Sequence, residues 1–167
     1  MEENNNKPPS DAEVDPVTAL SKIPLFSSMT KVHIKRLVDI GIYETYKPNE
    51  SIFSEGDVGD RFYVLLGGAV RISRTLPGLG EEALAVLKTG SHFGEMALID
   101  DGKRSADAKC HKKCTLFVIE KESFEELLFI ERDLAYELLW NFIRTLTQRL
   151  RETNDKMTFL TFAGKFS

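Results

Sequence analysis

The chain has 167 residues, which is enough for one ordinary domain with an additional long helix but too short for two independent cores. Hydrophobic residues make up 42% of it and charged residues 29%, proportions that exclude a disordered or a membrane-embedded protein. Its 22 Lys and Arg residues against 26 Asp and Glu residues give a net charge of −4, so we expect no nucleic-acid partner and no membrane partner.

The sequence carries no pattern of export. No apolar run approaches the roughly 20 residues of a membrane-spanning helix, and the chain start lacks the basic-then-apolar order of a secretory signal. Its two cysteines, Cys110 and Cys114, are too few for the disulfide framework of a small secreted protein. These features predict a cytoplasmic protein with reduced thiols.

The first part of the chain is expected to be a tail followed by short helices. Residues 1–16 contain almost no apolar side chains, so little burial would offset the entropy of ordering them, and we predict a flexible tail. From Val17 to Asp39, apolar residues recur at helical spacing, with an interruption at Pro24. This pattern predicts a pair of short helices at the start of a domain that spans residues 17–130.

Between Ile42 and Glu120 the pattern changes to short apolar or alternating runs separated by turns that contain glycine. Each run has the length of a strand. The runs are Ile42–Tyr46, Ser51–Phe53, Phe62–Leu66, Ala69–Arg74, Ala83–Leu87, Ser105–Lys109 and Thr115–Glu120. Many short strands with tight turns predict a β-sandwich or a β-barrel.

After Lys121 the helical period returns, first in a short helix and then in a long one over residues 131–161, with a tail at 162–167. Apolar residues along the long helix alternate steps of three and four, which is a heptad pattern. The positions are Tyr136, Leu139, Ile143, Leu146, Leu150, Thr153, Met157 and Leu160. We predict a helix that forms a homodimer, the alternative being an amphipathic helix that packs on its own domain.

The segment from Phe93 to Ala106 has the residue types of an anion site. A glycine, Gly94, precedes a short helical turn whose free backbone N–H groups suit a phosphate. Arg104 has the planar, permanently charged group that binds the same anion with two hydrogen bonds, and Glu95 supplies acceptors for sugar hydroxyls. Such spacing is common in turns and in surface ion pairs, so the segment alone is a weak signal.

Together with the segment Ile52–Val70, this segment resembles the cyclic-nucleotide-binding domains of the catabolite activator protein, protein kinase A regulatory subunits and cyclic-nucleotide-gated channels. The resemblance covers about Ser21 to Gly164. It implies a mainly β fold with flanking helices, namely an eight-stranded, jelly-roll-like β-roll followed by a long C-terminal dimerisation helix. It further implies a ligand, cAMP or possibly cGMP, held by a phosphate-binding cassette.

The resemblance also implies roles for individual residues. Glu95 matches the acid that binds the ribose 2′-hydroxyl, and Arg104 matches the arginine that binds the cyclic phosphate. Asp60 matches an acid that pairs with this arginine in kinase regulatory domains. The remaining positions implied to form the anion cradle are Gly94, Met96, Ala97, Ser105 and Ala106.

Three expectations concern the base of the nucleotide. Thr153 matches a threonine of the dimerising helix that bonds the adenine, and Asn154 stands where the relatives have a serine that reaches the base of the partner subunit. Thr153 has an equally plain interpretation as a polar residue that sets the register of the helix pair. Leu84 and Val86, which alternate on one strand, are candidates for the wall of the base pocket, although such residues more often pack in a core.

We weighed other functions against a sensor that signals to an effector protein. Cys110, His111 and Cys114 lie among lysines and lack the second ligand pair of a zinc site, and the three histidines are too scattered for a metal-dependent enzyme, so we expect no metal, no cofactor and no catalysis. A structural dimer with a degenerate pocket remains an alternative. A DNA-binding regulator is not expected, because residues 131–156 carry five basic and five acidic side chains, unless the chain is a fragment of one.

Overall fold

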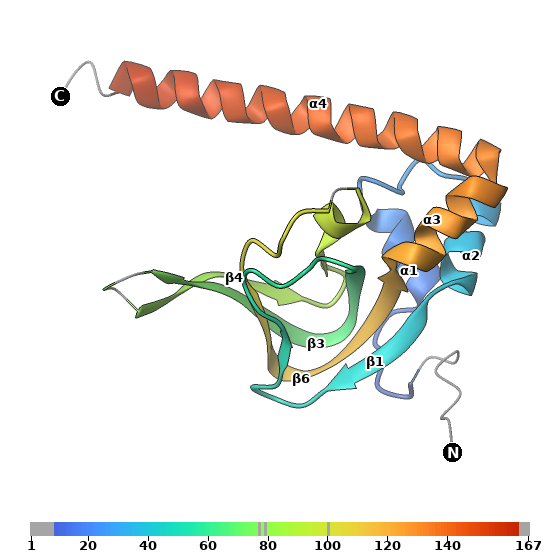
Figure 1. Cartoon of the computed structure of the whole chain (residues 1–167), viewed down its shortest axis with the longest axis horizontal. Coiled ribbons are helices and arrows are strands. Elements are labelled where there is room, and N and C mark those ends of the chain that lie inside the picture. Colours follow the sequence, from blue (N-terminus) through green and yellow to red (C-terminus); the bar gives the residue numbers. More distant parts are fainter. Residues whose placement is uncertain (1–8, 77, 79, 100, 164–167) are drawn as a thin grey trace.

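The computed structural model describes residues 9–76, 78, 80–99 and 101–163 (Figure 1). A few side chains within its helices and strands, among them those of Ala97, Thr153 and Leu160, lie outside the described part. The helices are α1 (Pro16–Lys22), α2 (Lys31–Asp39), α3 (Lys121–Ile130) and α4 (Arg132–Ala163), with a short 3₁₀ helix η1 (Glu95–Leu98). The strands are β1 (Ile42–Tyr46), β2 (Ser51–Phe53), β3 (Arg61–Leu76), β4 (Gly80–Lys88), β5 (His92–Phe93) and β6 (Asp107–Glu120).

Side chains cap both N-terminal helices. The carboxylate of Asp15 accepts a hydrogen bond from the backbone N–H of Thr18 at the start of α1, and the hydroxyl of Thr30 accepts one from His33 N–H at the start of α2. Such caps satisfy backbone donors that the first helical turn leaves free. The two predicted short helices are present, and Asp15 and Thr30 fix where each begins.

Part of the expected flexible tail is bound to the rest of the fold. The backbone N–H groups of Glu13 and Val14 both donate to the carbonyl oxygen of Leu66, at 2.9 and 3.2 Å. The carboxylate of Asp11 lies 3.1 Å from the hydroxyl oxygen of Thr115 and 2.7 Å from Nζ of Lys113. These polar contacts, together with the packing of Ala12 and Val14 against the core, hold a segment whose low hydrophobicity predicts a free tail.

The strands form one antiparallel sheet in the order β1-β6-β3-β4, with β2 paired to β6 and β5 paired to β3. Figure 1 shows this sheet curled into a roll, with α1, α2 and α3 gathered at one end. The prediction of a mainly β fold with flanking helices is confirmed. No described helix is both long enough and apolar enough to cross a membrane.

The structure describes six strands rather than the eight expected, because β3 and β6 each contain two of the predicted runs. The register between them shifts repeatedly between Leu65 and Val70, so the strands bend there without ending. A β-carbon on Gly68 would lie 2.1 Å from the carbonyl oxygen of Lys113, so the two bends pack directly on each other. Gly67 and Gly68 predict a turn between two strands, but in the structure they mark a bend within β3.

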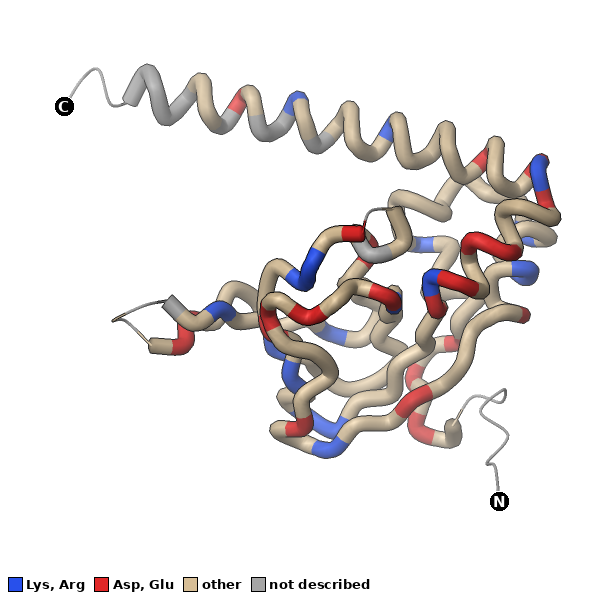
Figure 2. The backbone as a smooth tube through the Cα atoms, viewed as in Figure 1, with Lys and Arg blue, Asp and Glu red and all other residues tan. Residues whose placement is uncertain are grey.

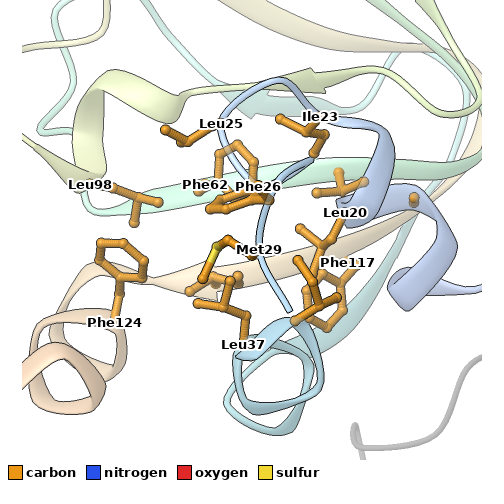
Figure 3. Packing of buried hydrophobic residues seen from close by; sticks show 14 of the residues in the cluster. Leu20, Ile23, Leu25, Phe26, Met29, Leu37, Phe62, Leu98, Phe117 and Phe124 are labelled. Carbon is orange, nitrogen blue, oxygen red and sulfur yellow. The ribbon is translucent and has the colours of Figure 1, made fainter. Parts of the chain in front are cut away.

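Two groups of buried residues fill the fold, one inside the roll and one between the roll and the helices. In the second group, Phe26 from the segment after α1 packs edge-on against Phe62 of β3, with ring centroids 5.8 Å apart. Figure 3 shows Leu98, from η1, in the same cluster near Phe124 of α3. The short helix η1 is thus anchored in the core that the flanking helices share.

The first turns of helix α4 anchor it to the rest of the fold. Leu134, Leu138 and Asn141 are buried, and Asn141 accepts a hydrogen bond from the hydroxyl of Ser28. Beyond this anchor α4 extends past the roll (Figure 1), and Figure 2 shows only scattered charges among its described residues. The described apolar residues of the heptad pattern are all exposed: Tyr136, Leu139, Ile143, Leu146, Leu150 and Met157.

Candidate functional site

The candidate site is built around the segment that joins β5 to β6. We call its described residues, 94–99 and 101–106, the cassette. Gly94 follows β5 with a φ of +74°, a conformation that side chains other than glycine rarely adopt. A β-carbon at this position would lie 2.7 Å from Nη1 of Arg104 and 3.0 Å from the carbonyl oxygen of Arg61. Glycine is therefore required both by the backbone and by the closeness of the arginine.

The loop between β2 and β3 holds the other end of this segment. The backbone N–H of Arg104 donates to the carbonyl oxygen of Asp57 at 2.8 Å, and the N–H of Gly56 donates to the carbonyl oxygen of Arg104 at 2.9 Å. Val58 and Lys103 form an isolated antiparallel bridge. The two segments that resemble one family thus meet in space, and the loop fixes the backbone of Arg104.

The side chain of Arg104 is buried between aromatic rings, with 7% of the residue exposed. Its guanidinium carbon lies 4.3 Å from the ring centroid of Phe53 and 5.6 Å from that of Tyr63. Tyr63 in turn stacks on Phe93, with centroids 4.9 Å apart. These rings attract a cation through their faces and limit the positions that the guanidinium can take.

The hydrogen bonds of this guanidinium are incomplete. Nη2 donates to the carbonyl oxygen of Arg61 at 2.8 Å and lies 3.8 Å from a carboxylate oxygen of Asp60, whereas Nε is buried with no acceptor among the described residues. Burial lowers the pKa of Arg104, against the opposing effects of Tyr63, Asp60 and Asp57. A buried donor left unpaired costs about 1–3 kcal/mol, so the site favours an anion that would accept from it.

Arg104 lies at a cavity of about 260 Å³. Polar groups come from Arg104, Glu95 and Ser105, and apolar walls come from both sheet and loop residues. The residues that line it are Phe53, Ile72, Leu87, His92, Phe93, Gly94, Glu95, Met96, Gly102, Lys103, Arg104, Ser105 and Ala106. A cation, a carboxylate and an apolar wall in one cavity suit a ligand that combines an anion, hydroxyl groups and a flat ring.

The structure brings most of the expected ligand-binding residues together. Those that line the cavity are Gly94, Glu95, Met96, Arg104, Ser105 and Ala106. Ala97 belongs to η1, but its side chain lies outside the described residues. Asp60 is exposed and lies near Arg104, where its carboxylate faces one edge of the guanidinium.

Leu84 and Val86 are not at this cavity, which corrects the expected base wall. Both are about half exposed, at 54% and 49%, and the cavity is instead lined by Ile72 of β3 and Leu87 of β4. The pairing of β3 with β4 shifts so that Ile72 opposes Ala85 and Ser73 opposes Ala83. Leu84 is thus the extra residue of a bulge, whereas Val86 opposes Arg71 on the face of the sheet that points away from Ile72 and Leu87.

Sequence reasoning also missed the aromatic side of the site. Phe53 ends β2, directly before the loop that holds Arg104, and Phe93 belongs to a strand of only two residues. Phe53 lies at a recognisable place, the boundary between a predicted strand and one of the two motifs. β5 gives no periodic signal, because two residues are too few to show an alternation.

Thr153 and Asn154 lie on α4, and neither is among the described residues that line the cavity. Asn154 is exposed, and the side chain of Thr153 lies outside the described part of the chain. Within one chain, α4 meets the cassette earlier along the helix, where Phe142, Thr145 and Leu146 line a second, smaller cavity of about 170 Å³. Met96 and Ile99 also line that cavity, from the side of the cassette.

The cysteine pair lies away from this site, on β6. Cys110 and Cys114 are both buried as free thiols, with their sulfur atoms 3.2 Å apart, and burial raises the pKa of Cys114. Over the described ranges, no three His, Cys, Asp or Glu side chains are grouped so that they could hold a metal ion.

Comparison with known proteins adds a family match. The family model of the cyclic nucleotide-binding domain matches residues 43–131. A cyclic AMP receptor protein from Thermus thermophilus is 32% identical over 139 residues, covering 83% of this chain and 62% of the relative. A cAMP-dependent protein kinase regulatory subunit from Eremothecium gossypii is 32% identical over 109 residues, covering 65% of this chain and 23% of the relative.

Solved structures agree with this match. The N-terminal domain of a transcriptional regulator from Streptomyces coelicolor superimposes with a TM-score of 0.74 at 32% identity, covering 83% of this chain and 94% of that one. The chain thus spans less than two thirds of the two curated relatives and nearly all of the solved domain. The matched residues include the whole cassette with Arg104.

Proposed function

This chain belongs to the cyclic nucleotide-binding domain family, and on that premise we propose that it is a cAMP sensor that transmits ligand occupancy to an effector protein. The proposal includes a homodimer formed through α4 and the cytoplasmic location expected from the sequence. It assigns the chain a regulatory rather than a catalytic role. The names of its relatives, a receptor protein and a kinase regulatory subunit, support that assignment.

The observation that carries the proposal is the buried, incompletely bonded guanidinium of Arg104. A cyclic phosphate carries one negative charge and offers two exocyclic oxygen acceptors, which suits the fork of an arginine. In the free chain, Nη2 is satisfied by the carbonyl oxygen of Arg61, while Nε has no acceptor among the described residues. A phosphate oxygen would supply the acceptor that Nε lacks. Pairing this buried donor would make the binding free energy more favourable.

The other cavity residues fit the sugar and the base. Glu95 lies beside Arg104 in the cavity lining, and its carboxylate would accept a hydrogen bond from the ribose 2′-hydroxyl. Ser105 would add a hydroxyl next to the phosphate. Ile72 and Leu87 provide an apolar surface for a flat base. We keep Thr153 and Asn154 as proposed base contacts that depend on the dimer.

Exposure along α4 supports the proposed dimer. Leu139, Leu146 and Leu150 are 57%, 57% and 62% exposed, although their spacing is that of a buried helix interface. Large apolar side chains in a continuous exposed row usually mark a contact with another protein. A second copy of α4 presents the same heptad pattern and would bury the row symmetrically.

The core offers a route for the signal. Leu98 of η1 is buried in the same cluster as Phe124 of α3, and α3 leads directly into α4. A ligand that pulls the cassette inward would shift Leu98 and hence the packing of α3. Transmission requires only that cAMP binds one arrangement of cassette and helices more tightly than the other.

The alternative of a structural dimer with a degenerate pocket is less favourable energetically. A chain without a ligand would retain a buried arginine with an unpaired donor, at a cost that an apolar replacement would remove.

Calorimetric titration of the purified chain tests the function directly. We expect saturable binding of cAMP at one site per chain and weaker binding of cGMP, and a cyclic dinucleotide is titrated as the third ligand. No heat of binding with any of the three would reject the sensor and favour the structural dimer.

A further inference from the structure

Lys103 lies at the cavity next to Arg104, and neither the resemblance nor the comparisons assign it a role. It is exposed, it lines the cavity, and its backbone is held by the bridge to Val58. Some other lysines of the fold are paired: Nζ of Lys113 lies 2.7 Å from Asp11, and Nζ of Lys121 lies 2.8 Å from Asp101. For Lys103, no carboxylate of the described chain lies within ion-pair distance.

The charges around Arg104 explain why a second cation would matter. Asp60 lies 3.8 Å from Nη2, and both Asp60 and Asp57 act electrostatically on the guanidinium. Glu95 adds a third carboxylate to the cavity lining. Arg61 also acts on Arg104, but its guanidinium is paired with Glu44 and Glu120, so without Lys103 the three carboxylates outnumber the cation at the cavity and an approaching anion would meet little net attraction. Lys103 adds a positive charge that is exposed and belongs to the cavity lining.

We infer that Lys103 steers the anionic ligand into the cavity, so that it speeds association rather than holding the bound phosphate. The inference rests on the proposed function and extends it to the kinetics of binding. An exposed lysine is flexible and fully hydrated, so its contact with a bound phosphate would be weak. Exposed charges near a binding site act mainly on the association rate, and salt screens that effect.

The test is stopped-flow binding of a fluorescent cAMP analogue to the full chain and to three variants. Lys103→Gln removes the charge, Lys103→Glu reverses it, and Lys112→Gln is the matched control, because Lys112 is also exposed but outside the lining of this cavity. At about 0.01 M salt the Debye length is about 30 Å, and at about 0.5 M salt the effect of an exposed charge is largely screened. All three substitutions are on the surface and leave the core unchanged.

At low salt we expect Lys103→Gln to slow association by about two- to fivefold, with dissociation unchanged, and Lys103→Glu to slow it further. At high salt the association rates should converge, and Lys112→Gln should match the parent at both. Equal association rates for parent and Lys103→Gln at low salt would overturn the inference while leaving the proposed function intact. Faster dissociation without slower association would overturn it as well, because Lys103 would then hold the phosphate. A parent that does not bind the analogue would overturn the proposed function, and the inference with it.

Discussion

Nη2 of Arg104 donates a hydrogen bond of 2.8 Å to the backbone carbonyl oxygen of Arg61. The side chain of Arg61 is itself held by Glu44 and Glu120, with N–O distances of 3.0 and 2.8 Å. The start of β3 therefore sets the position of Arg104 through a backbone atom, while Glu44 of β1 and Glu120 of β6 hold the side chain of Arg61. The direction of the guanidinium is a property of the roll and does not depend on the cassette alone.

A β-carbon at Gly94 should disturb this arrangement. We expect Gly94→Ala to cost about 1–2 kcal/mol of unfolding free energy from the positive φ, and to weaken cAMP binding because it displaces Nη1 of Arg104. Gly90→Ala is the control, since Gly90 has a φ of +88° but open space where its β-carbon would stand. Denaturant unfolding and calorimetry of both variants should show a stability loss for each, larger for Gly94→Ala because of its added contacts, with the affinity loss confined to Gly94→Ala. Equal affinities would contradict the contact.

The cap of α1 predicts a pH dependence of stability. Hydrogen bonds from the side chain and the backbone of Thr18 lower the pKa of Asp15 in the folded state. A carboxyl group whose pKa is lower in the folded state stabilises the fold at pH values above its unfolded-state pKa, near 3.8. This contribution is lost as the pH falls through the folded-state pKa. Asp15→Asn retains an acceptor for the cap, so it should be nearly as stable as the parent at pH 7 and less sensitive to acid.

Urea unfolding at several pH values between about 3 and 7 measures this difference. Asp15→Ala should lose about 0.5–2 kcal/mol at pH 7, because it lacks the cap altogether. A parent and an Asp15→Asn variant that lose stability in parallel below about pH 4 would show that this carboxylate does not contribute.

Much of the site could be predicted from the sequence, because its chemistry is concentrated in one short segment. Gly94, Glu95 and Arg104 are close together in the chain, and the structure brings all three to one cavity. The base wall could not be predicted in the same way. Ile72 and Leu87 line the cavity because they share one face of the β3–β4 pair, opposite to the face of Val86, and the run Ala83–Leu87 does not itself reveal which face turns inward.

The structure describes six strands instead of the expected eight for a related reason. Glycine between two apolar runs predicts a turn, but Gly67 and Gly68 lie inside β3, where the strand bends against β6. Whether a glycine pair ends a strand or bends it depends on the neighbouring strand, which local sequence does not reveal. The long helix, by contrast, can be predicted to within a turn at each end, since its period is sustained along its whole length.

The exposed row on α4 should decide the oligomeric state. We expect the parent to be a dimer in light scattering and the double variant Leu146→Lys, Leu150→Lys to be a monomer, because the dimer would bring like charges together in a buried interface. The matched control, Gln148→Lys with Asp155→Lys, changes exposed residues outside the heptad row and should remain dimeric. A monomeric parent, or a dimeric Leu146/Leu150 variant, would reject this interface.

Base selectivity should depend on the distal part of α4. If Thr153 bonds the adenine within the dimer, Thr153→Ala should lower cAMP affinity by about 0.5–1.5 kcal/mol and leave cGMP affinity nearly unchanged. The hydroxyl of Thr153 could accept a hydrogen bond from the adenine amino group, so we expect the parent to prefer cAMP. Parallel titrations with both nucleotides measure this, and equal losses for the two would mean that Thr153 acts through the helix pair.

The most direct measurement is the calorimetric titration of cAMP into the parent chain and into Arg104→Met, which keeps most of the side-chain volume between the aromatic rings and removes the charge. We expect the parent to bind and the variant to lose more than about a hundredfold in affinity, about 3 kcal/mol, because the phosphate would lose its buried charge partner. Thermal unfolding without ligand should show the variant at least as stable as the parent, since it lacks the unpaired Nε. A folded Arg104→Met variant that binds cAMP as tightly as the parent would contradict the assignment of this cavity as the cyclic nucleotide site.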